Sequence, residues 1–241
     1  MPASTVKILS SSGLEFDCYL ALPESTDRTP AIVLANAIVG VDEDLRAIAD
    51  EFAAAGYTAA APDLFWRTVP GPLTHEDLRT RPRGQPRLEK IKTGEADMAD
   101  TLKFLRTLPQ HNGRAAAMGF CYGGPYAILG PKRLGYDAGI SCHGTQLLDY
   151  IHDLDGLAAP ICIMWGDKDF AAPPTVREAY QAAAVRHGNV EVHVFPGVDH
   201  GYMLPHSPQA FDAVSRNFSM GRALSILEGL RGGERRIAAA E

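Results

Sequence analysis

Short apolar runs alternate with segments of helical periodicity along most of the chain. The apolar runs have the length of strands that are buried on both faces, and they lie at residues 31–35, 57–61, 115–118, 137–142, 161–165 and 190–195. The segments between them place apolar residues at helical spacing, and they lie at residues 42–55, 88–108, from about 122 onwards, 174–187 and 209–230. This alternation predicts an α/β domain with a mostly parallel central sheet and helices on both faces.

The pattern breaks between residues 64 and 87. This segment is rich in proline and arginine, has no clear period and is too long for an ordinary connection. We expect it to form a functional loop or a small cap. The chain shows neither internal repeats nor low-complexity blocks, so we predict a single domain over residues 1–241 with a frayed tail at about residues 231–241.

Composition and charge narrow the class of protein. The formal net charge of −6 argues against nucleic acid as the main partner, because neutralising phosphates needs a basic face. No apolar run reaches the roughly 18 residues of a membrane-spanning helix, and the first residues lack the pattern of a signal peptide. We therefore expect a cytoplasmic protein that binds neither membranes nor nucleic acid.

The four cysteines are scattered along the chain without the spacing of a zinc site: Cys18, Cys121, Cys142 and Cys162. An even number leaves two disulfides possible, but reduced thiols are expected in a cytoplasmic protein of this size. The sequence contains neither GxGxxG nor HExxH, so we expect no nucleotide cofactor and no metal.

The segment Gly119-Phe120-Cys121-Tyr122-Gly123-Gly124 lies where a predicted strand meets a predicted helix. Glycines two positions before and after Cys121 let the chain turn tightly and expose the side chain above the sheet. The N–H groups at the start of the following helix favour a thiolate and any oxyanion beside it. We predict that Cys121 is a nucleophile; the alternative is a buried cysteine at a tight strand–helix crossing.

A thiol nucleophile needs a base, and the base needs an acid that orients it. His200 lies after the last predicted strand and before the last helix, which is where the base is expected in this architecture. Asp167 and Asp169 both follow the strand at residues 161–165 and are both candidates for the acid. We favour Asp169, because Gly166 lets the chain turn over the rim of the sheet before it, and we assign Asp167 to capping that turn.

With these residues placed, the chain resembles the dienelactone hydrolase family (carboxymethylenebutenolidases) over essentially its whole length. The matching segments are Gly56-Tyr57, Ala61-Pro62-Asp63-Leu64, the turn around Cys121, Gly166-x-x-Asp169 and His200-Gly201-Tyr202. The cysteine makes the resemblance specific, since most α/β-hydrolases have serine there. The resemblance implies an α/β-hydrolase fold and a cofactor-free ester or lactone hydrolase with a Cys121–His200–Asp169 triad. The oxyanion hole is expected from the backbone N–H groups of Tyr122 and of the loop at residues 36–40, and the resemblance selects Ile38 in that loop.

Two positions depart from the family's pattern. Its best-known members carry a glutamate that exchanges a proton with the cysteine, and Ala37 stands at that position here. They also hold the substrate carboxylate with arginines, one of them four residues after the catalytic histidine, where this chain has Leu204. Arginines of the irregular segment could replace it, or could be solvated and paired with neighbouring acids. A more neutral ester or lactone is therefore expected, and the candidate substrate-binding residues are Ala37, Trp66, Arg79, Arg81, Tyr202 and Leu204.

The expected reaction begins with attack of Cys121 on the substrate carbonyl and passes through a thioester that water hydrolyses. Three alternatives stay open at this point. The same triad could act on phosphorus, as in a phosphotriesterase; the chain could bind a small ligand without turnover; or Cys121 could have a redox role, which the missing CxxC partner weakens. The expected partner is a small-molecule ester or lactone, and the protein is expected to be a monomer or a homodimer.

Overall fold

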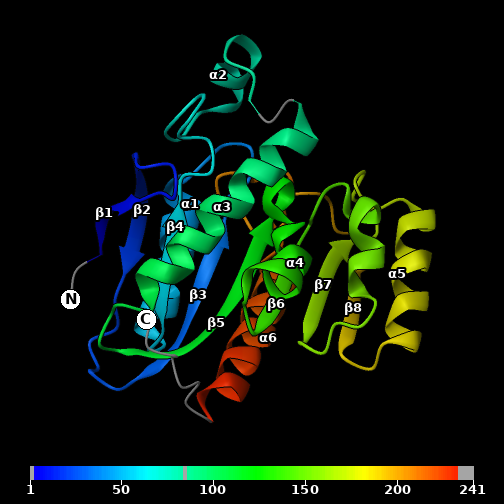
Figure 1. Cartoon of the computed structure of the whole chain (residues 1–241). Helices are drawn as coiled ribbons and strands as arrows, with labels where there is room; N and C mark the ends of the chain where they lie inside the picture. The colour runs from blue at the N-terminus through cyan, green and yellow to red at the C-terminus, as the bar shows by residue number, and fades with distance from the viewer. Residues whose placement is uncertain (1–2, 84–85, 233–241) are drawn as a thin grey trace.

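The computed structural model describes residues 3–83 and 86–232. Its strands are β1 (Ser4–Leu9), β2 (Glu15–Ala21), β3 (Thr29–Ala35), β4 (Thr58–Pro62), β5 (His111–Phe120), β6 (Ala138–Cys142), β7 (Ile161–Gly166) and β8 (Val190–Phe195). They form one eight-stranded sheet in the order β1-β2-β4-β3-β5-β6-β7-β8 (Figure 1). β2 pairs antiparallel with β1 and with β4, and every later pairing, from β4 to β8, is parallel. The predicted α/β-hydrolase architecture with a mostly parallel sheet is confirmed.

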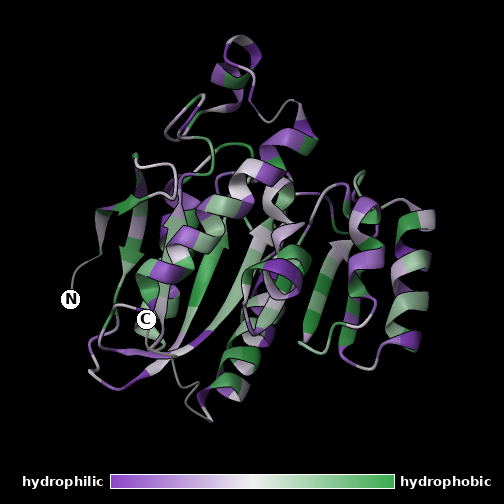
Figure 2. Cartoon of the chain, viewed as in Figure 1, coloured by the Kyte–Doolittle hydropathy of each residue, from purple (hydrophilic) through white to green (hydrophobic). Residues whose placement is uncertain are grey.

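Helices cover both faces of the sheet (Figure 1). The α-helices are α1 (Glu43–Ala54), α2 (His75–Thr80), α3 (Arg87–Leu105), α4 (Tyr126–Leu129), α5 (Pro174–Arg186) and α6 (Ala213–Arg231). α1 and α6 pack on one face, and α3, α4 and α5 pack on the other. Strands β3 and β7 are buried at every position and are apolar in Figure 2, because a strand covered on both sides has no face for polar residues.

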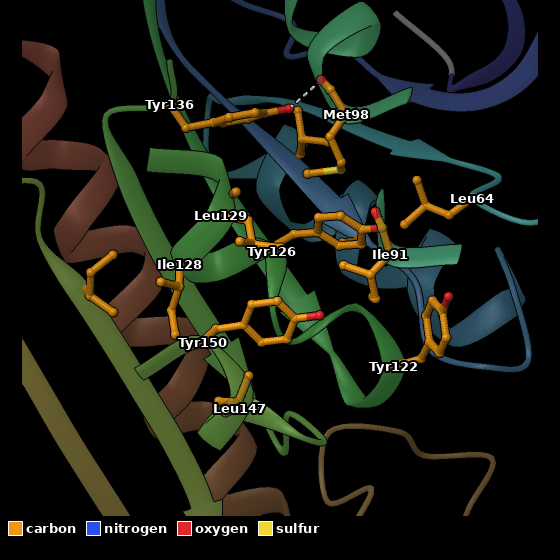
Figure 3. Close-up of a cluster of buried hydrophobic side chains, with 14 of the residues drawn as sticks. Leu64, Ile91, Met98, Tyr122, Tyr126, Ile128, Leu129, Tyr136, Leu147 and Tyr150 are labelled. Carbon is orange, nitrogen blue, oxygen red and sulfur yellow. Dashed lines mark hydrogen bonds between the residues drawn. The ribbon is translucent and has the colours of Figure 1, made fainter. Parts of the chain in front are cut away.

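Buried tyrosines join α3 to the segment that follows β5 (Figure 3). The Tyr126 hydroxyl donates to the Ile91 carbonyl at 2.9 Å, and the Tyr136 hydroxyl donates to the Met98 carbonyl at 2.8 Å. Both phenols therefore keep their hydrogen bond inside the core, as buried hydroxyls must. Gly94 allows this close approach, because a Cβ atom at that position would overlap the Tyr126 hydroxyl.

The structure differs from the sequence-based expectation in four places. The helix expected from about residue 122 is broken into a 3₁₀ turn (Cys121–Gly123), α4 and a π-helical turn (Gly130–Leu134). Pro131 has no backbone N–H with which to continue α4. β1 and β2 were not predicted, and the irregular segment contains the short helix α2. The expected frayed tail begins inside α6 at Arg231, and residues 233–241 lie outside the described residues.

None of the helices in the described part of the chain is long and apolar enough to cross a membrane. All four cysteines are unpaired.

Candidate active site

The residues of the candidate site follow the carboxyl ends of neighbouring parallel strands. Ile38 comes after β3, Cys121 after β5, Asp169 after β7 and His200 after β8. Because parallel strands all end at the same edge of the sheet, loops that are far apart in the sequence meet there.

A sharp turn presents Cys121 at this edge. Cys121 has a φ of 49°, in the left-handed region that residues with a side chain rarely adopt. The turn is tight, since a Cβ atom at Gly119 would overlap the Gly123 carbonyl and one at Gly123 would overlap the Ala35 carbonyl. Glycine is thus required on both sides of Cys121, and strain of this kind is typical of functional sites.

His200 and Asp169 form a hydrogen-bonded pair beside Cys121. His200 Nδ1 lies 2.9 Å from Asp169 Oδ1, which also accepts the Ala171 N–H at 2.8 Å. Burial works to lower the pKa of His200, but hydrogen bonds to Asp169 and Cys121 and the charges of these groups outweigh it and raise the pKa to about 9. The competing Asp167 is exposed and accepts the Gly197 N–H at 2.7 Å instead.

The loop after β3 is held rigidly next to Cys121. The Asn36 side chain donates to the Ala37 carbonyl at 2.8 Å and accepts the Leu64 N–H at 3.2 Å. Gly40 has a φ of 92°, and a Cβ atom there would lie 2.6 Å from the Gly71 carbonyl. The loop that carries Ile38 is therefore held against the irregular segment, at Leu64 and at Gly71.

A pocket of about 620 Å³ opens over Cys121 and His200. Of the other predicted site residues, Ala37, Ile38 and Leu204 also line it. Its remaining walls come from the first turn of α1, from residues 72–77 and from residues 206–210. The structure therefore brings Cys121, His200 and the β3 loop together around one cavity of a size suited to a small molecule.

Four predicted substrate-binding residues do not line this pocket. Tyr202, predicted to bind substrate, is completely buried, and its hydroxyl lies 2.8 Å from Ser219 Oγ, so its side chain belongs to the core and not to the pocket. Trp66 stacks on Phe16 with ring centres 5.7 Å apart. The other two belong to α2 and its C-terminus and are exposed, with Arg79 ion-paired to Glu76 at 2.6 Å: Arg79 and Arg81.

His143 is part of the site and was missed. It follows β6 with a φ of 42°, is fully buried and lines the pocket. Its ring lies 4.9 Å from the His200 ring in an edge-to-face arrangement, and neither ring nitrogen has a hydrogen-bond partner among the described residues. Burial and the neighbouring His200 lower the pKa of His143 well below its usual value, so this imidazole is neutral. Its place at the end of a predicted strand was the only signal in the sequence.

Arg87 stabilises the turn around Cys121, and this role was not predicted from the sequence. Its Nη2 donates to the carbonyls of Tyr122 and Thr145, at 3.0 Å in each case. Its guanidinium lies 4.5 Å from the centre of the Tyr122 ring. Thr145 in turn donates its backbone N–H to the Cys121 carbonyl at 2.9 Å. Arg87, at the start of α3, therefore ties together the two loops that flank the nucleophile.

A second group of possible ligand atoms lies away from the pocket. Cys162, Glu191 and His193 on β7 and β8 place a sulfur, a carboxylate oxygen and a ring nitrogen within 4.8 Å of one another. Arg222 ion-pairs with Glu191 at 2.8 Å, which places a positive charge where a metal ion would have to bind.

Comparisons with known proteins identify the family. The model of the dienelactone hydrolase family matches residues 16–229. Carboxymethylenebutenolidase 1 of Cupriavidus pinatubonensis is 28% identical over 234 residues, which cover 96% of this chain and 99% of the relative. The carboxymethylenebutenolidase of Pseudomonas putida is 24% identical over 200 residues, covering 82% of this chain and 84% of the relative.

Two solved structures share the fold. A dienelactone hydrolase-like promiscuous phosphotriesterase from metagenomic libraries superposes with a TM-score of 0.81 at 17% identity, covering 96% of this chain and all of the other. The dienelactone hydrolase of Anabaena variabilis superposes with a TM-score of 0.64 at 20% identity, covering 90% of this chain and 95% of the other.

Proposed function

Because the chain belongs to the dienelactone hydrolase family, we propose that it hydrolyses carboxylic esters or lactones with Cys121 as nucleophile, His200 as base and Asp169 as the residue that orients the base. The observation that carries the proposal is the His200–Asp169 hydrogen bond of 2.9 Å beside Cys121 at the floor of one pocket. The raised pKa of His200, with hydrogen bonds to Asp169 and Cys121 among its causes, supports a Cys121–His200 pair in which the imidazole exchanges protons with the thiol.

The first half of the reaction forms a thioester. The Cys121 thiolate attacks the carbonyl carbon, and a C–S bond forms while the carbonyl electrons move to oxygen. The oxyanion accepts hydrogen bonds from the backbone N–H groups of Tyr122 and Ile38, and removing one such donor typically costs about 100-fold in rate. The C–O bond then breaks, and the alkoxide takes its proton from protonated His200.

The second half releases the acid. Neutral His200 removes a proton from water as that water attacks the thioester carbon. The C–S bond breaks, Cys121 leaves as the thiolate, and the proton stays on His200, so the resting pair is restored. Asp169 keeps Nε2 of His200 directed at the reacting atoms and stabilises the positive charge on the ring.

The substrate that fits best carries no carboxylate. Ala37 and Leu204 stand at the two positions where the resemblance expects a glutamate and an arginine, and both line the pocket. Apolar side chains of the β3 loop and of the irregular segment form much of the remaining wall: Ile38, Val39, Val41 and Leu73.

Hydrolysis of p-nitrophenyl acetate, recorded from the first turnover, tests the proposal. We expect a burst of about one nitrophenolate per site in the wild type, because acylation of a thiol outruns hydrolysis of the thioester with so reactive an ester. Cys121→Ala should abolish the burst, and His200→Ala should slow both phases. Equal near-background rates in all three proteins, with matching circular dichroism spectra, would refute the triad. Paraoxon in the same assay tests the phosphotriesterase alternative.

A further inference from the structure

Part of the pocket wall is acidic. Four carboxylates line the pocket on this side: Asp42, Glu43, Asp44 and Asp77. The first three belong to the N-cap and first turn of α1, and Asp77 belongs to α2 of the irregular segment. Among the described residues, Arg46 is the one lysine or arginine in the same wall.

Besides Arg46, which keeps its charge, the described lining includes the imidazoles of His75, His143, His200 and His206. His200 is positively charged at neutral pH because its pKa is raised to about 9, and the four carboxylates outnumber it and Arg46. The Arg46 guanidinium carbon lies 5.4 Å from the ring centre of Tyr19, which does not line the pocket. His206 Nδ1 lies 2.7 Å from Asp44 Oδ1, and its Nε2 lies 3.5 Å from Glu43. One protonated His206 therefore faces two carboxylates and can neutralise only one of them. His143, at the floor, adds no charge because it is neutral.

Neither Asp42 nor Asp77 forms a direct ion pair within the described residues, although the charge of His206 acts on Asp42 and that of Arg81 acts on Asp77. Each caps a helix: Asp42 accepts the Leu45 N–H at 3.0 Å, and Asp77 accepts the Thr74 N–H at 2.9 Å and the Thr74 hydroxyl at 2.7 Å. Burial is the main reason that the pKa of Asp42 is raised. Burial makes the ionised form of such a carboxylate less stable, and a cation that binds beside it restores much of the lost stability.

We propose that this pocket selects esters and lactones by charge: it favours a substrate whose acyl part carries a positive charge and disfavours one that carries a carboxylate. This inference rests on the proposed ester hydrolysis and adds the charge class of the substrate. The acidic wall attracts a quaternary ammonium or protonated amine that extends from the carbonyl towards α1, and the apolar side chains of the β3 loop pack against its carbon atoms.

Three p-nitrophenyl esters that differ only in the end of the acyl chain test this inference. They are the ester of γ-trimethylammoniobutyrate, its uncharged tert-butyl isostere and the mono-ester of glutarate. Each kcat/KM is divided by the second-order rate constant for attack of mercaptoethanol on the same ester. This reference corrects for differences in intrinsic reactivity, whereas the spontaneous rate does not, because the free carboxylate of the glutarate ester attacks its own carbonyl. At low ionic strength we expect the order cationic, neutral, anionic, with at least about tenfold between the two charged esters.

Asp42→Asn and Asp77→Asn, singly and together, remove the charges while keeping a side chain that caps a helix almost as well. The double variant should lose most of the charge order, measured as the ratio of the normalised kcat/KM values for the cationic and anionic esters. Glu178→Gln is the matched control, because Glu178 is exposed on α5 and does not line the pocket. A charge order that persists in the double variant overturns the inference, and so does a wild type that hydrolyses the glutarate ester as fast as the neutral tert-butyl ester.

Salt dependence of the wild type gives an answer that needs no variant. Raising the sodium chloride concentration should lower kcat/KM for the cationic ester, raise it for the anionic ester and leave the neutral one unchanged, because salt screens charges near the surface. Equal responses of all three esters overturn the charge selection. If the neutral ester itself shows no burst that depends on Cys121, the proposed hydrolysis has failed; if it shows the burst but the charge order is absent, only the charge inference has failed.

Discussion

Replacing Asp169 with asparagine should move the ionisation of His200 towards lower pH. The two side chains are joined by a hydrogen bond of 2.9 Å, and Asp169 is only 2% exposed, so its charge is poorly screened by water. Asparagine keeps the size of the side chain and removes the charge. Its amide can also donate to Nδ1, which would place the ring proton on Nε2, facing Cys121, where a base must be free.

The magnitude follows from the raised pKa. His200 ionises at about 9 instead of 6.5, and this difference of about 2.5 units corresponds to about 3.4 kcal/mol. The hydrogen bond to Asp169 is the largest of the contributions that raise the pKa, so its loss should lower the pKa by about one unit or more. Because the folded-state pKa is raised, His200 contributes stability that is fully present below about pH 6.5 and is lost as the pH rises through about 9. Asp169→Asn should therefore be destabilising at mildly acid pH and much less so above the pKa of His200.

Two measurements check this expectation. The first is the pH dependence of kcat/KM for methyl butyrate, followed by titration of the released acid, since methoxide needs the proton of His200 to leave. The second is a nuclear magnetic resonance titration of the His200 ring in the resting protein. The wild type should lose activity with a midpoint near pH 9, and Asp169→Asn should show an earlier midpoint and a kcat lower by about 1,000-fold or more.

Asp167→Asn is the matched control for this substitution. Asp167 lies two residues away and accepts the Gly197 N–H rather than contacting His200, so the midpoint should stay where it is. An unchanged titration of His200 in Asp169→Asn, or the same shift in both variants, would refute the reasoning.

Three further substitutions have definite expected outcomes. Arg87→Met removes the hydrogen bonds to the carbonyls of Tyr122 and Thr145. In steady-state kinetics it should lower kcat several-fold with little change in KM, and in urea unfolding it should lower the free energy of unfolding by about 1–3 kcal/mol. A kcat equal to that of the wild type would contradict the support role of Arg87. Gly94→Ala should lower the free energy of unfolding by about 1–3 kcal/mol, because the added methyl group overlaps the Tyr126 hydroxyl. Adding Tyr126→Phe should recover part of that loss, and strictly additive effects of the two substitutions would argue against the overlap. Leu204→Arg places a cation on the pocket wall. It should raise kcat/KM for the p-nitrophenyl glutarate mono-ester by about tenfold relative to the neutral tert-butyl ester. Equal effects on both esters would show that the side chain does not act through its charge.

The central strands could be predicted because their burial is uniform. β3 and β7 are buried at every position, so their sequences are continuous apolar runs that stand out from the surrounding helices. β2 was missed because its residues alternate between exposed and buried, as expected for an antiparallel strand near the edge of the sheet. Such a strand carries polar residues on its open face, and over so few positions the alternation is hard to distinguish from a loop.

The turn at Cys121 could be predicted because its causes are local. Close approach of the backbone requires glycine at positions 119 and 123, and both residues are visible in the sequence within two positions of the cysteine. Asp169 and His200 follow from the order of strands along the chain. His143 could not be found in this way, because its role depends on the packing of its ring against His200 and on the absence of a partner for its nitrogens within the described residues.

The arginines of the irregular segment show why the charge of the pocket is a property of the tertiary structure. Arg79 and Arg87 lie eight positions apart, each near acidic residues, and sequence alone gives no reason to treat them differently. Arg79 pairs with Glu76 on the exposed surface, whereas Arg87 binds the carbonyls of Tyr122 and Thr145, which are 35 and 58 residues away in the chain. Neither arginine lines the pocket, so neither can offset the carboxylates of α1 and α2. A substrate carboxylate would therefore meet negative charge at the acidic wall of the pocket, and this is the physical basis for expecting neutral or cationic esters.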